Sequence, residues 1–251
     1  MTVEFRMRTH RKRGESEYAG IPIHAAPGVH EAVLALVREY VRPGSRLVDL
    51  GAGSGALSLR LANCGYQVEA ADLNVSDWGP VRIPVVQQDL SADVWASLAG
   101  RTYDTAVAVE LIEHLENPTQ FLRNARRLLR VGGYLLLTTP NVLDLDSRRL
   151  LLTKGEFALF RRGTLYSTGH LAILPYWLLE DLLQLVGFRV IERRFVGKRK
   201  RPGLRGLIVP LVNLVLLPLG LRLPWQTAFG TCVAILCTPL DDPAGSEALI
   251  R

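Results

Sequence analysis

Cysteine is scarce in this chain and internal repeats are lacking, which narrows the classes of protein to which it can belong. The three cysteines are an odd number and form no C-x-x-C pair, so they cannot build a complete disulfide framework. Reduced thiols in a cytoplasmic protein are the simpler interpretation. No repeat and no low-complexity tract is apparent, so nothing in the sequence points to a solenoid.

The sequence also shows no secretion signal and no clear membrane-spanning run. The basic residues at the start precede no apolar core segment of the signal-peptide type. The uncharged run from Leu207 to Leu221 is shorter than the roughly 20 residues that a spanning helix needs, and prolines interrupt it. We therefore expect a cytoplasmic protein.

The composition is that of a folded α/β domain. The chain has 251 residues, of which 48% are hydrophobic and 22% charged, and its mean hydropathy is +0.16. These values allow a full core and argue against disorder. We expect a single domain over residues 1–251 that begins with a polar segment, residues 1–25.

Residues 46–55, Arg-Leu-Val-Asp-Leu-Gly-Ala-Gly-Ser-Gly, organise the rest of the chain. Their apolar residues predict a short buried strand with Asp49 at its carboxyl end, and a helical run starts after Gly55. Gly51 and Gly53 stand between the two. A strand that passes through a glycine turn into a helix directs N–H groups and the positive helix end at a ligand. Glycine is needed there because a side chain would hold the ligand away or forbid a positive φ.

Two classes of ligand fit this turn. The spacing Gly51-x-Gly53-x-x-Ala56 matches the relaxed dinucleotide fingerprint, whereas glycines at 51, 53 and 55 behind an acid suit an aminoacyl-nucleoside. Asp72 lies about twenty residues beyond the glycines, where a carboxylate accepts hydrogen bonds from ribose hydroxyls. The alternative for Asp72 is a solvated acid at a strand end, and the preceding turn favours the ligand-binding interpretation.

Four further apolar stretches predict strands, at residues 66–71, 85–90, 104–109 and 134–138. Asp89, near the end of the second stretch, could meet an exocyclic amine of an adenine. It could also cap the helical stretch that contains Trp95. Further helices are expected from Pro27, from Thr119 and from Pro175.

Five motifs follow one another along the chain. They are Asp49-Leu-Gly-Ala-Gly-Ser-Gly55, the acid Asp72, Gln88-Asp89-Leu90, Glu110-x-x-Glu113-His114, and Gly132-Gly133 through Asn141. The ordered set resembles class I S-adenosylmethionine-dependent methyltransferases, and more narrowly the branch with quinone-biosynthesis and other small-molecule O-methyltransferases. The resemblance covers about residues 29–195 and a final strand near 231–239, and it displaces the dinucleotide interpretation.

The resemblance implies a Rossmann-like α/β fold: a seven-stranded, mostly parallel sheet with an antiparallel last strand and helices on both faces. It also implies S-adenosylmethionine as cofactor and methyl transfer to an oxygen of a small-molecule or lipid-linked acceptor. The residues expected to bind the cofactor are Asp49, Gly51, Ala52, Gly53, Gly55, Asp72, Leu73, Asp89, Leu90 and Glu110.

His114 is the candidate catalytic base, because it follows the fourth strand at the edge where the site should lie and imidazole titrates near neutrality. The alternative role for His114 is that of an orienting or helix-starting residue.

Glu110, Glu113 and His114 also form a cluster that the resembling quinone O-methyltransferases associate with a divalent metal. Many relatives need none, so we expect no metal ligands, with Mg²⁺ as the alternative. His170 is a second candidate, for which a structural hydrogen bond is favoured.

Residues 198–225 depart from the minimal family pattern, which has a short connection there. A basic stretch, Lys198 to Arg201, stands before the apolar run 207–221. An apolar segment beside basic residues is typical of a monotopic membrane contact. We expect a cytoplasmic protein held at the membrane surface, with a lid or a subunit contact as the alternatives and the oligomeric state open.

Two other functions compete with this hypothesis. The formal net charge of +6 allows a nucleic-acid methyltransferase. Against it, Glu110-Leu-Ile-Glu113 stands where an amine-methylating Asn- or Asp-Pro-Pro-aromatic motif would be, and no aromatic stacking platform accompanies the basic runs. We therefore expect no nucleic-acid partner. The third possibility is a protein that binds the cofactor without catalysis.

Overall fold

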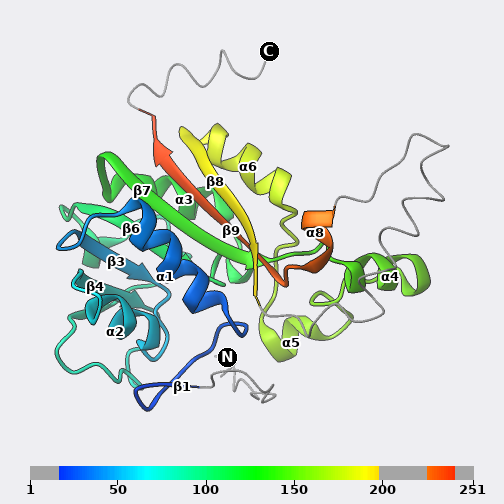
Figure 1. Cartoon of the computed structure of the whole chain (residues 1–251), viewed down its shortest axis with the longest axis horizontal. Helices are drawn as coiled ribbons and strands as arrows, with labels where there is room; N and C mark the ends of the chain where they lie inside the picture. Colours follow the sequence, from blue (N-terminus) through cyan, green and yellow to red (C-terminus); the bar gives the residue numbers. More distant parts are fainter. Residues whose placement is uncertain (1–16, 198–224, 241–251) are drawn as a thin grey trace.

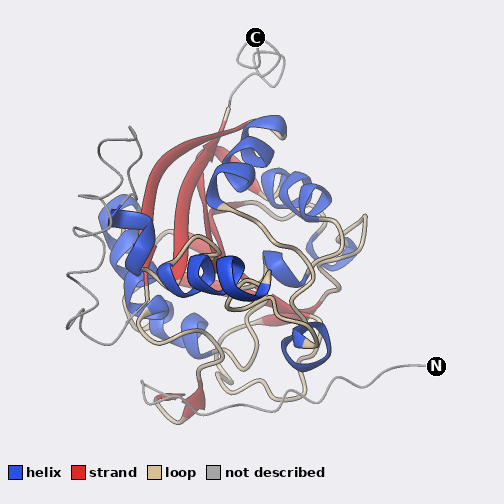
Figure 2. Ribbon diagram, turned by 90° about the vertical axis from the view of Figure 1, so that its right-hand side faces the viewer, coloured by secondary structure: helices blue, strands red, loops and turns tan. Residues whose placement is uncertain are grey.

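A seven-stranded β-sheet forms the centre of the protein, and helices cover both of its faces (Figures 1 and 2). The computed structural model describes residues 17–197 and 225–240. The strands are β3 Arg46–Leu50, β4 Gln67–Asp72, β5 Val85–Gln87, β6 Tyr103–Val109, β7 Leu129–Pro140, β8 Phe188–Val196 and β9 Cys232–Pro239. Their order in the sheet is β5-β4-β3-β6-β7-β9-β8. Among these seven strands, β9 runs in the direction opposite to the other six, which confirms the expected sheet.

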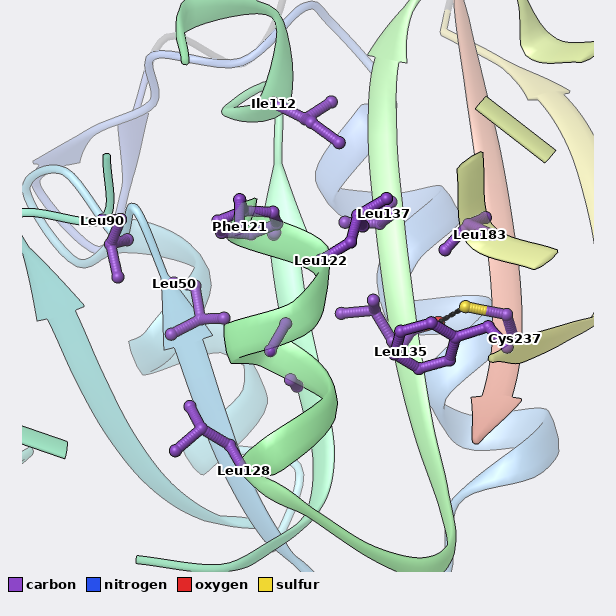
Figure 3. Close-up of a cluster of buried hydrophobic side chains, with 14 of the residues drawn as sticks. Leu50, Leu90, Ile112, Phe121, Leu122, Leu128, Leu135, Leu137, Leu183 and Cys237 are labelled. Carbon is purple, nitrogen blue, oxygen red and sulfur yellow. Dashed lines mark hydrogen bonds between the residues drawn. The ribbon is translucent and has the colours of Figure 1, made fainter. Parts of the chain in front are cut away.

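Successive side chains of the central strands enter two hydrophobic cores. In β7, Leu135 and Leu137 lie in one core and Leu136 in the other. This alternation is what a strand covered on both faces requires. Figure 3 shows the first core, in which Leu122 lies beside Leu137 of β7. The helices that supply these cores are α1 Val29–Tyr40 and α2 Ala56–Ala62 on one face, and α3 Pro118–Arg127 and α6 Tyr176–Leu185 on the other.

The remaining described elements are short. They are the strands β1 Glu17–Tyr18 and β2 Ile21–Pro22, the 3-10 turns η1 Ala96–Leu98 and η2 Ile112–His114, and the helices α4 Leu145–Lys154, α5 Thr164–Thr168 and α8 Trp225–Phe229. Helix α8 contacts α4. Figure 1 shows α8 and α4 on its right-hand side.

Local sequence explains where α3 begins. The side chain of Asn117 accepts a hydrogen bond from the backbone N–H of Gln120 at 3.0 Å, which satisfies one of the free donors of the first turn. Pro118 occupies the first helical position, where its missing N–H costs nothing. The helix therefore starts one residue before the predicted Thr119.

The strand and the helix predicted on either side of Asp89 are both shorter than expected. Strand β5 covers only Val85–Gln87, because Asp89 folds the chain into a turn by accepting hydrogen bonds from the N–H and hydroxyl of Ser91. The helical stretch with Trp95 is reduced to the single turn η1. One turn is enough to bury Trp95 against Phe121, with ring centroids 5.4 Å apart.

The predicted fifth strand is also longer than expected. It begins before the two glycines, and Gly132 lies inside β7 with a φ of +70°.

The polar segment 1–25 lies partly outside the described residues. Its described part, residues 17–25, begins with a hairpin of β1 and β2. Ile21 is buried, so this part of the segment belongs to the packed structure.

The basic and apolar insertion, residues 198–225, lies outside the described residues except for Trp225, where α8 begins. Within residues 17–197 and 225–240, no helix combines the length and the apolar character that crossing a bilayer requires.

Strand order places a topological switch point at the end of β3. Strand β3 pairs with β4 on one side and β6 on the other, so the chain changes its direction of progress across the sheet there. Such a switch point opens a crevice at the carboxyl ends of the strands in α/β sheets. Residues 51–55, the glycine turn, directly follow β3.

Candidate functional site

The glycine turn adopts the backbone that its sequence predicts. Gly51, Gly53 and Gly55 have φ values of +75°, +55° and +90°. The N–H groups of the turn were expected to point at a ligand, but they are hydrogen-bonded within the protein. Gly51 and Ala52 donate to the carbonyl of Ala71, and Gly53 donates to the Asp72 carboxylate at 2.7 Å. In this conformation these donors fasten the turn to the end of β4 instead of facing an open crevice.

Side chains of neighbouring segments pack directly against the glycines. A Cβ on Gly51 would lie 2.9 Å from Leu111, and one on Gly53 would lie 3.3 Å from the His24 ring. A Cβ on Gly55 would meet Pro80 at 2.5 Å. The segment after β6 and the N-terminal segment therefore both reach the turn, and a side chain at any of the three glycines would disturb this junction.

Asp72 lies beside the turn, as predicted, and is half-buried. Its other carboxylate oxygen accepts the N–H of Asn74 at 3.0 Å. The two N–H donors fix the orientation of the carboxylate and leave further lone pairs for a ligand. Leu73, next to it, is 62% exposed.

Asp89 lies at the surface, and the side chain of Leu90 lies in the core. Asp89 is exposed, and one of its oxygens is held by Ser91 at 2.6 and 2.8 Å. The side chain of Leu90 is buried in the core of Figure 3, so only its backbone can reach a ligand. The cap predicted for Asp89 is replaced by this turn.

Asp49 is buried beneath the turn, with 1% of its surface exposed. It accepts a hydrogen bond from the Ser58 hydroxyl of α2 at 2.6 Å. Burial raises the pKa of the Asp49 carboxyl to about 7, and the Ser58 hydrogen bond opposes this rise. Asp49 therefore joins β3 to α2 and reaches a ligand only through the elements that it positions.

Glu110 is held in a left-handed backbone conformation, with a φ of +49°, which is uncommon for a residue with a side chain. Its carboxylate accepts the N–H of Ala26 at 2.5 Å and the thiol of Cys232 at 3.0 Å. Burial raises the pKa of Glu110, and these two hydrogen bonds oppose the rise. Glu110 thus ties the N-terminal segment and β9 to the end of β6.

Residues 21–26 cross the carboxyl edge of the sheet, where the sequence offered only His24 as a residue that could line a lid. The Ser54 hydroxyl of the turn donates to the carbonyl of Pro22 at 2.7 Å, while Ala26 is bound to Glu110. Exposed His24 lies against Gly53. The mostly apolar run from Ile21 to Pro27 is the other sequence signal for this cover.

A compact cluster of Glu113, His114 and His170 follows β6. One potential ligand atom from each residue lies within 4.8 Å of the other two. The rings of His114 and His170 meet edge to face, with centroids 4.9 Å apart. Glu113 and His114 come from η2, whereas His170 follows α5, so a long connection folds back to complete the cluster.

Hydrogen bonds orient each member of the cluster. His170 Nδ1 lies 2.8 Å from the Leu159 carbonyl, and His114 is hydrogen-bonded to the Gly169 backbone. Glu113 is fully buried and accepts from the Thr139 hydroxyl at 3.1 Å through Oε2, while no partner is found for its Oε1 in the described part of the chain.

Burial is the largest influence on the pKa values of His114 and Glu113 in this cluster. It lowers the pKa of His114, as does the nearby His170, so the neutral imidazole is favoured at neutral pH. It raises the pKa of the Glu113 carboxyl to about 8, with the charge of Glu110 adding to the effect. A neutral imidazole can accept a proton from a substrate hydroxyl.

The Mg²⁺ alternative does not fit this arrangement. Glu110 is not a member of the cluster that the described residues form, and its carboxylate is bound to Ala26 and Cys232. Two imidazoles and one carboxylate remain, whereas Mg²⁺ prefers oxygen ligands.

Comparisons with known proteins agree with the fold. A family model described as "Methyltransferase domain" matches residues 24–193. A relative named ubiquinone biosynthesis O-methyltransferase, from Burkholderia thailandensis, is 32% identical over 122 residues, which are 46% of this chain and 52% of the relative. The chain thus spans about half the length of such curated relatives.

Solved structures show the same fold at low identity. An S-adenosylmethionine-dependent methyltransferase from Archaeoglobus fulgidus has a TM-score of 0.56 at 19% identity and covers 84% of this chain and 95% of its own. Magnesium protoporphyrin IX methyltransferase from Synechocystis PCC 6803, solved with bound SAH, has a TM-score of 0.55 at 16% identity, over 84% of this chain and 82% of its own.

Proposed function

The chain belongs to the methyltransferase domain family, as a class I S-adenosylmethionine-dependent methyltransferase, and we propose that it methylates an oxygen of a small-molecule or lipid-linked acceptor. The relatives named ubiquinone biosynthesis O-methyltransferase support oxygen as the target atom. The neutral imidazole of His114 supports it too, because a hydroxyl acceptor gains most from a base.

One observation carries this proposal: the glycine turn and the histidine cluster meet at the same edge of the sheet. Leu111, which directly precedes η2, packs against Gly51, so the segment that bears His114 is joined to the turn. A cofactor on the turn and an acceptor at His114 would therefore be neighbours. Such positioning contributes on the order of 7–11 kcal/mol in favourable cases.

The proposed cofactor site uses the side chains that border the turn. When bound, S-adenosylmethionine supplies an electrophilic methyl group on a sulfonium. The Asp72 carboxylate, oriented by Gly53 and Asn74, would accept hydrogen bonds from the ribose hydroxyls. Asp89 and the backbone of Leu90 would contact the adenine, and exposed Leu73 would cover it.

The other predicted cofactor residues act mainly on the shape of this site. Gly51, Gly53 and Gly55 leave room for the side chains that pack against the turn, and Ala52 donates its N–H to the carbonyl of Ala71. Asp49 holds the start of α2 through Ser58, and Glu110 holds the N-terminal cover through Ala26. We assign both acids to positioning, since their hydrogen-bonding oxygens already have protein partners.

His114 is the proposed base. The Gly169 backbone fixes the ring, and the lowered pKa keeps it unprotonated and ready to accept the hydroxyl proton. A base of this kind contributes about 10²–10⁴-fold to the rate.

We further propose that residues 198–225 hold the protein at the cytoplasmic face of a membrane. The support is the basic stretch followed by an apolar run in the sequence. Leu152, on the helix that α8 contacts, is 87% exposed, and Tyr166 of α5 is 81% exposed. A lipid-linked acceptor would then reach the site from the bilayer.

Two experiments test these proposals separately. Isothermal titration should show binding of S-adenosylmethionine, and tight binding of NAD without it would end the cofactor assignment. Flotation with anionic liposomes should recover the intact chain at low salt but not a chain lacking residues 203–223. If both remain in the soluble fraction, the segment is a lid or a subunit contact.

A further inference from the structure

The N-terminal cover, residues 21–26, crosses the turn that we propose for the cofactor. Figure 1 shows this segment in blue, running from β1 to the start of α1. The carbonyl of Pro22 accepts a hydrogen bond from the Ser54 hydroxyl of the turn at 2.7 Å. Farther along, the N–H of Ala26 donates to the Glu110 carboxylate. The cover is therefore fastened both to the turn and to the end of β6.

Three segments of the chain approach the glycines of the turn. Leu111 lies against the first glycine, the His24 ring against the second and Pro80 against the third. Pro80 is buried, and Leu111 leads directly into the fully buried Ile112. His24 is exposed. The cover is therefore the one of these three segments that can move aside for a ligand without disturbing the core.

Both flanks of the cover are fastened more firmly than its middle. On one side, the Arg60 guanidinium lies 4.4 Å from the ring centroid of Tyr18, whose hydroxyl accepts a hydrogen bond from Asn63. On the other side, Val29 of α1 is fully buried. Residues 22–26 between them are exposed or half-buried. Segments with few buried contacts open locally, so these residues can lift while their flanks stay in place.

Glu110 links the cover to the rest of the site. Its φ of +49° is uncommon for a residue with a side chain, and such a backbone persists only where its surroundings hold it. Its carboxylate accepts from Ala26 on one side and from the Cys232 thiol on the other. The next residue, Leu111, packs against Gly51. One residue thus joins the cover and β9 to the glycine turn.

We infer that the N-terminal cover is a gate over the cofactor turn, held shut by its hydrogen bonds to Ser54 and Glu110. This rests on the proposed function, because the gate acts on S-adenosylmethionine only if the cofactor binds at the turn. The gate opens to admit the cofactor and again to release the demethylated product. Its two hydrogen bonds are made within the protein, so they close it equally over an empty and an occupied turn. They therefore set the rates of cofactor exchange and leave the affinity nearly unchanged.

Stopped-flow tryptophan fluorescence with S-adenosylhomocysteine, the product of methyl transfer, measures these rates in the full chain. Trp78 lies beside Gly55 and provides a signal at the turn. Ser54→Ala should raise the association and dissociation rate constants together, by roughly 2–10-fold, which corresponds to one hydrogen bond. Their ratio, the dissociation constant, should stay close to that of the parent. Thr153→Ala removes a comparable hydroxyl-to-carbonyl hydrogen bond in α4 and should leave both rate constants unchanged.

Hydrogen exchange tests the gate without any ligand. The amide of Ala26 should exchange through local opening, well before the amides of the central strand β7, and Ser54→Ala should speed this exchange by the same factor. Glu110→Gln keeps a single acceptor oxygen for Ala26 and Cys232, so it should also speed the exchange. Both variants should keep the circular dichroism of the parent, which separates local opening from a folding defect.

Two results would overturn the inference. In the first, Ser54→Ala raises the dissociation rate constant alone, which would make the cover a fixed ligand contact. In the second, the Ala26 amide exchanges only with global unfolding. Failure of the parent to bind S-adenosylhomocysteine while Ala26 still opens locally would instead count against the proposed function, and the opening of the cover itself would be supported.

Discussion

The buried carboxyl of Asp49 should make the stability of the protein depend on pH. Its pKa rises from 3.8 to about 7 because burial disfavours the charged form. Between these values the folded chain keeps a proton that the unfolded chain has lost. Stability should therefore fall as the pH rises from about 4 to about 7, and it should stay at the lower level above pH 7.

Asp49→Asn removes this titration. At 1.36 kcal/mol per pKa unit, the shift corresponds to about 4 kcal/mol of destabilisation at pH 8 that the variant would avoid. The new amide still accepts from Ser58 but introduces a buried N–H₂ group, which costs about 1–3 kcal/mol if unpaired. The variant should thus be less stable than the parent below pH 4 and more stable by about 1–3 kcal/mol above pH 7.

Urea unfolding followed by far-UV circular dichroism from pH 4 to pH 8.5 measures this crossover. Ser58→Ala is the matched control: it removes the donor that favours the charged carboxylate, so the fall in its stability should continue to a higher pH than in the parent. A difference between Asp49→Asn and the parent that stays constant over this range would refute the reasoning.

The remaining predictions concern the cofactor and the base. Asp72→Ala should weaken S-adenosylmethionine binding by about 1.5–3 kcal/mol in calorimetry, whereas the exposed Asp77→Ala should not, and equal affinities would refute the ribose assignment. Gly53→Val should abolish binding, since φ is +55° and the His24 ring lies 3.3 Å from the new Cβ, while Gly65→Val strains the backbone in open space and should still bind. His114→Gln should cut turnover by about 10²–10⁴-fold without changing cofactor affinity, and unchanged turnover would remove His114 as base. In the parent, the acidic limb of the pH–rate profile should lie below the ordinary imidazole pKa of 6.5.

Much of the sheet could be predicted because the sequence patterns that specify its strands are local. Runs of apolar residues marked the strands, and the predicted helix starts at Thr119 and Pro175 lie within a residue of the observed ones. The helix predicted around Trp95 was wrong because tertiary packing of a single turn already buries that ring.

The site was predictable only in part, because its contacts join distant segments. Nothing local shows that Glu110 is bound to Cys232, 122 positions away. The approach of His170 to His114 likewise depends on how the connection through α5 folds. Sequence order located the glycine turn and His114, whereas the third member of the cluster required the fold.

Identification of the methylated atom tests the central claim most directly. The full chain would be incubated with S-adenosylmethionine that carries a ¹³C-labelled methyl group, together with a soluble or a membrane extract. The methyl-carbon resonance of the product distinguishes a methyl on oxygen from one on nitrogen, carbon or sulfur. A labelled methoxy group on a small or lipid-soluble product, absent with Gly53→Val, is the predicted result. Label on nitrogen or in nucleic acid, or no transfer to any extract despite intact cofactor binding, would contradict it.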